Sequence, residues 1–288
     1  MNPYVILVDS ACDVTPDNLD KWGLKYTQLS YSFTDSERTY ANYEMPYPEF
    51  YQKMRDGGVA KTAAVNVETF KDLFKAELEL GQDVLYLAFS SGLSTTCNSG
   101  RIAAEELREA YPDRRIIVID SLAASAGYGL LAYLAAVKRD EGASIDEVAA
   151  LLTDSVPHLC HWFTVDDLVY LKRGGRVSPT VALVGGILGI KPVLHVDDEG
   201  HLINMSKVRG RKKAIEALAD KYDELALTPD EGTVFISHGD CLDDATALAD
   251  ILRQRHGVEV KLITYVGPVI GAHSGPGTLA LFFLGKHK

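Results

Sequence analysis

Apolar runs and helix-spaced apolar residues alternate along the first half of the chain. Short apolar runs of strand type occupy residues 4–8, 84–89 and 116–119. In residues 68–80 and 125–139, apolar side chains instead recur at the three- and four-residue spacing of a helix. Strands that alternate with helices are typical of a parallel sheet covered on both faces. The first half therefore predicts a three-layer α/β/α unit.

The pattern changes near Pro157, where shorter apolar runs take over. We expect strands at residues 161–165, 192–196, 201–205, 233–237, 258–265 and 279–284, and helices at 211–222 and 243–256. A D-D-E-G turn at residues 197–200 joins two of these strands as a hairpin, so parallel and antiparallel pairs should mix. The sequence thus predicts an N-terminal α/β domain over residues 1–157. It predicts a C-terminal two-layer α/β domain with a mixed sheet over residues 158–288.

The segment S-S-G-L-S-T-T at residues 90–96 separates a predicted strand from the helix that follows it. In α/β sheets, ligands lie at the carboxyl ends of strands, where this segment falls. Its hydroxyls, with Ser94 and Thr95 foremost, and the free N–H groups of a helix start suit an anion such as a carboxylate or phosphate. The same hydroxyls could simply cap the helix, for about 1 kcal/mol, and both roles can hold together. Asp9 and Asp120 end two strands on the same side of the sheet as this loop, and we expect them to brace it with hydrogen bonds.

Composition and charge narrow the classes of partner. The chain of 288 residues is 47% hydrophobic and 24% charged, with a net charge of −11. An acidic surface repels nucleic acid and anionic membranes, so neither is expected as the main partner. The 4 cysteines are far apart and form no C-x-x-C pair, which predicts neither a disulfide framework nor a metal site and favours the cytoplasm. Prolines, glycines and a lysine interrupt the apolar run at residues 177–196, so we expect no stable membrane insertion.

Several short motifs, spread over nearly the whole chain, resemble one known family. They are V-I-L-V-D-S-A-C-D at residues 5–13, F-S-S-G-L-S-T-T at 89–96, D-S-L-A-A-S-A-G-Y-G at 120–129, L-K-R-G-G-R-V-S at 171–178, G-I-L-G-I-K-P-V-L at 186–194 and G-P-V-I-G-A-H-S-G-P-G-T-L at 267–279. In this order and at these intervals they are similar to the DegV family of bacterial fatty-acid-binding proteins.

The resemblance implies a two-domain DegV-like fold that holds one long-chain fatty acid, such as palmitate, stearate or oleate, between its domains. The tail would lie in an apolar tunnel, for which residues 181–194 and 279–284 are apolar candidates. Some family members are carrier subunits of a bacterial fatty acid kinase that serves phospholipid synthesis. They present the bound carboxylate to a separate ATP-dependent subunit, which makes the acyl phosphate. The resemblance therefore implies a lipid carrier with no catalytic site of its own and no cofactor.

The resemblance also implies which residues hold the fatty-acid carboxylate: Thr62, Ser94, Thr95, His273 and Ser274. His273 and Ser274 stand in G-A-H-S-G-P-G, which matches the family pattern G-x-H-[TS]-G-P-G. Ser94 matches the serine of S-S-G-L-S-G-T, although the order Thr-Thr here departs from Gly-Thr. Thr62 matches the threonine of a T-S-x-P-S loop. That loop reads T-A-A-V-N here and lacks the Ser and the Pro, so a turn hydroxyl that bonds its own backbone is an alternative role.

Arginines provide a second group of candidates. Arg173 and Arg176 flank two glycines in a loop that the resemblance implies at the mouth of the site. The planar guanidinium donates two parallel hydrogen bonds to a carboxylate or phosphate, so we expect head-group or partner contacts, with solvated arginines as the alternative. The chain has one basic cluster, which consists of Lys207, Arg209, Arg211, Lys212 and Lys213. We expect these side chains to be solvated at the start of a helix. The alternative is a docking patch for a kinase or an anionic membrane.

Other functions stay open at this point. A serine hydrolase or acyltransferase would use Ser94 as the nucleophile and His273 as the base. Residues 92–96 depart from the G-x-S-x-G motif, because Thr96 takes the place of the last glycine. A kinase or phosphotransferase is a further alternative, since the fold resembles a domain of dihydroxyacetone kinases, but the chain has no G-x-x-x-x-G-K-[ST] motif. A plain interaction protein is supported only by the basic cluster.

Overall fold

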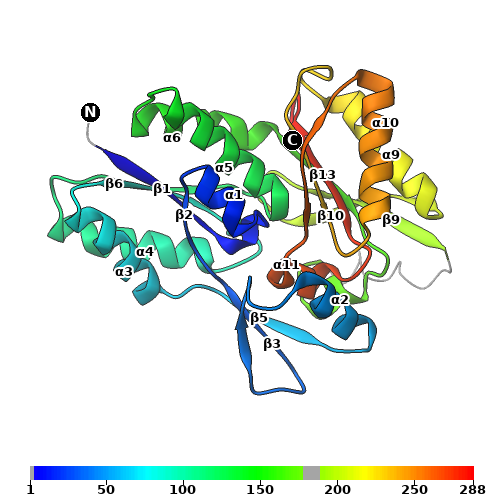
Figure 1. The fold of residues 1–288 in the computed structure, drawn as a ribbon, viewed down its shortest axis with the longest axis horizontal. Coiled ribbons are helices and arrows are strands. Elements are labelled where there is room, and N and C mark those ends of the chain that lie inside the picture. The colour runs from blue at the N-terminus through cyan, green and yellow to red at the C-terminus, as the bar shows by residue number, and fades with distance from the viewer. Residues whose placement is uncertain (1–2, 178–188) are drawn as a thin grey trace.

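The computed structural model of the chain describes residues 3–177 and 189–288. Its first half is built on a 4-stranded parallel sheet in the order β2 (Lys25–Thr27), β1 (Tyr4–Asp9), β6 (Asp83–Ala88), β7 (Ile116–Asp120). Figure 1 shows α3 (Val67–Glu79) and α4 (Thr96–Ala110) on one face of this sheet and α5 (Ser125–Asp140) and α6 (Ile145–Ser155) on the other. The predicted three-layer α/β/α arrangement is therefore confirmed.

The second half is built on a 6-stranded mixed sheet. Its order is β10 (Leu202–Arg209), β9 (Ile190–Val196), β8 (Leu159–Thr164), β13 (Leu279–Leu284), β11 (Val234–His238), β12 (Val260–Tyr265). Within it β11 and β12 pair in parallel, and its other pairs are antiparallel. Two helices, α9 (Arg211–Leu225) and α10 (Leu242–His256), cover its outer face (Figure 1). The mixed sheet and the β9–β10 hairpin are confirmed, while the domain boundary after residue 157 stays a prediction.

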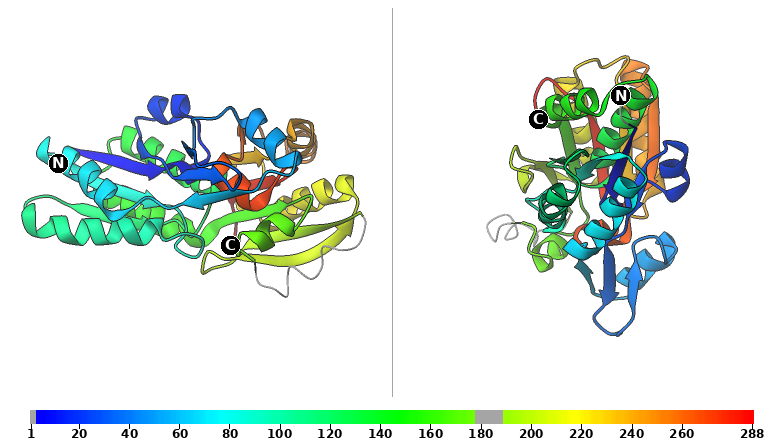
Figure 2. Two further views of the ribbon diagram at one scale, coloured as in Figure 1. Left: turned by 90° about the horizontal axis from the view of Figure 1, so that it is seen from below. Right: turned by 90° about the vertical axis from the view of Figure 1, so that its left-hand side faces the viewer.

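Helix α5 lies against both sheets and joins the two halves of the molecule. The inner face of the mixed sheet packs on this helix, where Phe282 lies against Gly127: a Cβ on Gly127 would come within 2.5 Å of the Phe282 ring. The glycine therefore permits a helix–sheet approach that any other residue would obstruct. Phe163, Phe235 and Phe282 belong to the same buried core as the parallel sheet. Figure 2 shows the two halves as neighbouring parts of one elongated molecule.

A third, 3-stranded antiparallel sheet extends from the first half, in the order β4 (Thr39–Ala41), β3 (Ser30–Phe33), β5 (Ala60–Ala63). Helix α2 (Tyr47–Arg55) lies between β4 and β5 in the chain. The sequence predicted a polar loop around Thr62, and this prediction is wrong at Thr62, which pairs with Tyr31 as part of β5. Backbone hydrogen bonds to β3 form the strand here. Its sequence, A-K-T-A, is too short and too poor in β-branched and aromatic residues to have predicted it.

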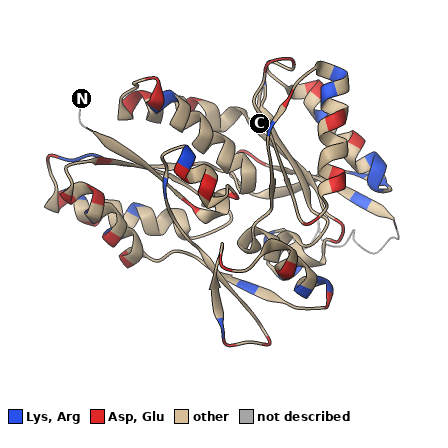
Figure 3. Ribbon diagram, in the orientation of Figure 1, with Lys and Arg blue, Asp and Glu red and all other residues tan. Residues whose placement is uncertain are grey.

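Short helices complete the described part of the chain: α1 (Pro16–Lys21), α7 (Val169–Arg173), α11 (Pro268–Ser274) and the 3₁₀ turns η1 (Ser10–Cys12) and η2 (Val156–His158). Figure 3 shows basic residues at the start of α9. Lys212 and Lys213 are exposed there, as predicted, but Arg211 forms ion pairs with Asp244 and Asp166. Across residues 3–177 and 189–288, no helix has the length and apolar character needed to span a bilayer.

Candidate functional site

A cavity of about 240 Å³ takes its walls from both halves of the chain. The predicted carboxylate contacts all line it: Thr62, Ser94, Thr95, His273 and Ser274. Arg176 lines it as well, whereas Arg173 is exposed, with its guanidinium 5.9 Å from the ring centre of Tyr170. Apolar side chains form much of the remaining wall: Leu29, Phe89, Leu93, Phe163, Leu171, Leu202, Val266, Val269, Ile270 and Ala280. Of the predicted tunnel segments, 279–284 contributes Ala280, and residues 181–188 lie outside the described residues.

Thr62 and His273 meet across the cavity wall, although 211 residues separate them in the sequence. Strand β5 carries the threonine and α11 the histidine, and Thr62 Oγ1 lies 2.9 Å from His273 Nε2. Burial, followed by the positive charge of Arg176, lowers the pKa of His273 to about 4. The imidazole is therefore neutral near pH 7, with one ring nitrogen as a donor and the other as an acceptor.

Two buried polar atoms at this site have no hydrogen-bond partner among the described residues. They are Nδ1 of His273 and Oγ of Ser274, which is only 5% exposed. A buried polar group without a partner costs about 1–3 kcal/mol, so native structures rarely leave one unsatisfied. His273 Nδ1 faces Gly174, so Ser274 Oγ is the atom of the two for which a polar group of a ligand in the cavity is the expected partner.

The turn that contains Gly174 and Arg176 closes over the same histidine. A Cβ on Gly174 would lie 3.1 Å from both Cγ and Cε1 of His273 and closer still to Nδ1, so only glycine leaves room for the imidazole. Arg176 donates from Nη1 to the carbonyl oxygen of Gly174 at 2.5 Å and from Nε to that of Leu93 at 3.3 Å. Partial burial lowers the pKa of the Arg176 guanidinium from its usual value. Arg176 thus joins this turn to the loop after β6 and adds a positive charge to the cavity.

The loop after β6 is held by carboxylates, as predicted. Asp9 Oδ2 accepts hydrogen bonds from Phe89 N at 3.1 Å and from the Tyr86 hydroxyl at 2.8 Å, and burial raises the Asp9 pKa to about 6. Asp120 Oδ1 accepts one from Ser91 N at 3.2 Å. These contacts fix the backbone that carries the candidate hydroxyls.

Ser94 caps helix α4 while it lines the cavity. Its Oγ accepts a hydrogen bond from Thr96 N at 3.2 Å and lies 2.9 Å from Thr96 Oγ1, whereas the Thr95 side chain makes no cap bond. A hydroxyl has two acceptor lone pairs and one donor hydrogen, so capping leaves capacity for a ligand. The hydrolase alternative requires a hydrogen bond between Ser94 and His273. In the structure, His273 Nε2 pairs with Thr62 and the Ser94 hydroxyl pairs with Thr96.

A buried polar cluster beside the cavity was not predicted as part of the site. Ser125 Oγ donates to Asp13 Oδ2 at 2.5 Å and lies 2.9 Å from Ser237 Oγ, and Thr264 Oγ1 donates to the backbone oxygen of Asp13 at 3.0 Å. Burial raises the pKa of the Asp13 carboxyl to about 8. Ser125 and Ser237 line the cavity, so this cluster joins the two halves directly at its wall. Asp13 and Ser125 lie in two of the sequence motifs, and this was the one feature of the sequence that could have indicated the cluster.

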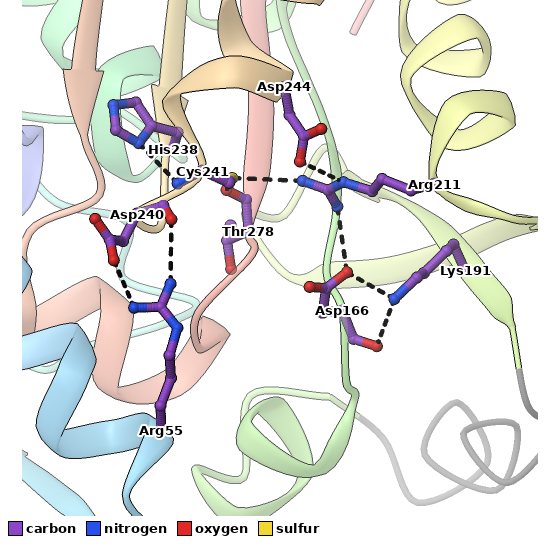
Figure 4. Close-up of polar contacts among 9 residues, drawn as sticks. All are labelled: Arg55, Asp166, Lys191, Arg211, His238, Asp240, Cys241, Asp244 and Thr278. Atoms are coloured by element: carbon purple, nitrogen blue, oxygen red, sulfur yellow. Dashed lines mark hydrogen bonds and ion pairs between the residues drawn. The ribbon is translucent and has the colours of Figure 1, made fainter.

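An ion-pair network supports the loop that follows His273 and Ser274 (Figure 4). Asp166 accepts from Lys191 Nζ at 2.6 Å and lies 3.6 Å from Arg211 Nη1, and its carboxylate packs against Gly277. The Cys241 thiol contacts the carbonyl oxygen of Thr278 at 3.3 Å. The network therefore fixes the loop from outside the cavity, which explains why Arg211 is not a solvated member of the basic cluster.

The fold and the cavity define a class of α/β protein in which two sheet-containing halves enclose an apolar pocket with buried polar groups. Residues 3–286 match the family model described as "Uncharacterised protein, DegV family", so the chain belongs to the DegV family, as its motifs predicted. A DegV domain-containing protein of Clostridium perfringens is 43% identical over 289 residues, which cover 100% of this chain and 99% of the relative.

Solved structures of the same fold carry descriptions of what they bind. A Thermotoga maritima protein described as revealing a fatty acid binding function is 33% identical, with a TM-score of 0.85 over 99% of this chain and 100% of that chain. A stearic acid-binding protein from Eubacterium ventriosum is 28% identical, with a TM-score of 0.88 over 98% of both chains. The predicted two-part DegV-like fold is thus confirmed.

Proposed function

We propose that this protein binds one long-chain fatty acid, such as palmitate, stearate or oleate, with its carboxylate at His273 and Ser274 and its tail along the apolar wall. The observation that carries the proposal is Ser274 Oγ, a buried atom without a partner among the described residues, in a cavity with a largely apolar wall that Thr62 and His273 also line. The fatty-acid-binding descriptions of the Thermotoga and Eubacterium proteins support it.

The hydrogen-bond pattern is consistent with a carboxylate at this position. His273 Nδ1 faces Gly174, so the histidine acts through Thr62: if Nε2 donates to Thr62 Oγ1 over 2.9 Å, the Thr62 hydroxyl keeps its own hydrogen for the carboxylate. Ser274 donates its own hydroxyl hydrogen, Ser94 and Thr95 add hydroxyls from the start of α4, and Arg176 supplies positive charge. The acyl chain supplies the affinity, since each buried methylene contributes about 0.8 kcal/mol, and the polar groups fix the orientation.

We infer further that the protein is a cytoplasmic carrier without chemistry of its own, built from domains of residues 1–157 and 158–288. In this role it presents the carboxylate to an ATP-dependent fatty acid kinase subunit. Arg173 supports a partner contact, because it is exposed three residues away from Arg176 in a turn that closes over His273. The hydrolase alternative with Ser94 and His273 predicts instead a covalent acyl adduct on Ser94.

Mass spectrometry of the purified protein, native and after organic extraction, tests binding. We expect one fatty acid per chain in the wild type and weaker retention in Ser274→Ala. Ser99→Ala is a matched control, since this half-buried serine of α4 does not line the cavity. A protein that is empty and takes up no added stearate would contradict the proposal, and an acyl adduct on Ser94 would favour the hydrolase. Adding a purified kinase subunit, ATP and hydroxylamine tests presentation, because hydroxylamine traps an acyl phosphate as the hydroxamate.

A further inference from the structure

His161 is a buried histidine on the cavity wall that the proposed carboxylate contacts do not use. It lies on β8, is 4% exposed and lines the cavity. Its ring packs at 4.6 Å from the ring of Phe282 and at 5.6 Å from that of Phe163. Its Nδ1 is buried and has no hydrogen-bond partner among residues 3–177 and 189–288. An imidazole held between phenylalanines with an unsatisfied nitrogen indicates a missing polar partner.

The strand register separates His161 from the carboxylate contacts. His161 pairs with Phe282 across β8 and β13, and Phe163 pairs with Ala280. Thr278, which closely follows His273 and Ser274, immediately precedes β13. Phe282 lies four residues beyond Thr278, roughly 13 Å along an extended strand, so His161 is at a different level of the sheet. A ligand whose carboxylate lies at the Thr278 end of β13 would therefore meet His161 roughly 13 Å farther along its chain, near the middle of a long acyl chain.

The environment of His161 decides which chemical group could bind there. Burial lowers its pKa well below the usual value, with His195 and Lys288 as smaller contributions, so the ring is neutral. A neutral imidazole offers one donor and one acceptor, which matches a hydroxyl. A second carboxylate would instead be a buried charge between aromatic rings, without a cationic partner at His161 itself.

We propose that the cavity has two polar positions and that its preferred ligand is a long-chain fatty acid with a hydroxyl near mid-chain, which hydrogen bonds to His161. This inference rests on the proposed fatty-acid binding and narrows its substrate class. The carboxylate fixes one end at His273 and Ser274, and His161 selects the chain by the position of its hydroxyl.

Competition binding with stearate and with hydroxystearates tests the inference, using isomers hydroxylated near the carboxylate, at mid-chain and near the methyl end. We expect the wild type to prefer the mid-chain isomer over stearate by about five- to tenfold, the effect of one additional buried hydrogen bond. His161→Phe, which extends the surrounding phenylalanine cluster, should remove this preference and bind stearate at least as tightly as before. His195→Phe removes a histidine from the opposite face of the sheet, where it stacks on Trp162 and bonds the carbonyl oxygen of His161 at 3.2 Å. It leaves the His161 side chain in place and should keep the preference.

The outcomes separate this inference from the proposed function. Tight stearate binding with no preference for the mid-chain isomer, or a preference that survives in His161→Phe, would overturn the role of His161 alone. A preference for the isomer hydroxylated next to the carboxylate would also overturn it, because that hydroxyl would lie near Ser274. Failure to bind stearate and every hydroxystearate would overturn the proposed function itself.

Discussion

Gly174 provides a sharp test of the carboxylate site, because its substitution acts on His273 without altering a polar group. Its backbone has φ −72° and ψ −13°, which any residue adopts, so Gly174→Ala introduces no backbone strain. The added Cβ would instead lie 3.1 Å from His273 Cγ and Cε1 and closer to Nδ1. To restore ordinary contact distances of about 3.5–4.0 Å, the imidazole would have to move by about 1 Å or more.

That displacement would change the hydrogen bonds expected to hold the ligand. A Cβ in line with Nδ1 would push the ring away from Gly174 and so distort the Thr62–His273 bond, which is 2.9 Å long in the wild type. Loss of one to two net hydrogen bonds, at about 1 kcal/mol each, predicts fatty-acid affinity lower by about five- to thirtyfold. Overpacking would also lower the free energy of unfolding by about 1–3 kcal/mol.

Gly175→Ala is the matched control. Gly175 has φ +70°, and no described atom lies within 4 Å of the position that a Cβ would take, so alanine there costs about 1 kcal/mol of backbone strain without a steric clash. Fluorescent fatty-acid displacement and urea unfolding on both variants separate the effects: both should be less stable, and only Gly174→Ala should bind weakly. If Gly174→Ala binds stearate as tightly as the wild type, His273 does not position the carboxylate.

Two further predictions concern stability. Burial raises the Asp13 pKa from 3.8 to about 8, so between these values the folded protein holds a proton that the unfolded chain has released, and stability falls as pH rises. Between pH 6 and 8, above the Asp9 pKa of about 6, the free energy of unfolding of the wild type should fall by up to about 1.4 kcal/mol per pH unit. Urea unfolding of Asp13→Asn should show a much smaller fall. Equal slopes for the two proteins would contradict the argument that burial raises the Asp13 pKa. Ser94→Ala removes the α4 cap and should cost about 1 kcal/mol, whereas Thr95→Val, which loses no cap bond, should not; equal unfolding midpoints for the two would show that the cap bond is unimportant.

Local patterns were sufficient to predict much of the fold. The strand at 279–284 has the predicted bounds, and the turn at 197–200 joins β9 and β10 as expected. These features depend on side-chain alternation and turn residues that lie next to one another in the sequence. Strand β5 and helix α11 were not predicted, because pairing with β3 makes the first and glycines interrupt the apolar pattern of the second.

The candidate site could be predicted only where a motif carried it. Thr62, Ser94, His273 and Ser274 were expected from the family resemblance, but no local pattern indicates that Thr62 and His273 lie 2.9 Å apart. His161 looks like an ordinary residue of an apolar strand, and its importance depends on its lack of a partner within the described part of the folded chain. Sequence patterns report what a residue offers, whereas a binding site depends on which of those groups the fold leaves unsatisfied.

The way in which the two halves are joined bears on how selective the cavity can be. Gly127 lets α5 pack directly on Phe282, and Ser125 and Ser237 join the halves through Asp13 at the cavity wall. Contacts of this kind hold the walls in place before a ligand arrives, so little binding energy is lost in ordering them. A cavity with fixed walls also cannot move a polar group to meet a poorly matched ligand. The polar groups of His273, Ser274 and His161 therefore have fixed positions, and a fatty acid binds tightly only if its own polar groups match them.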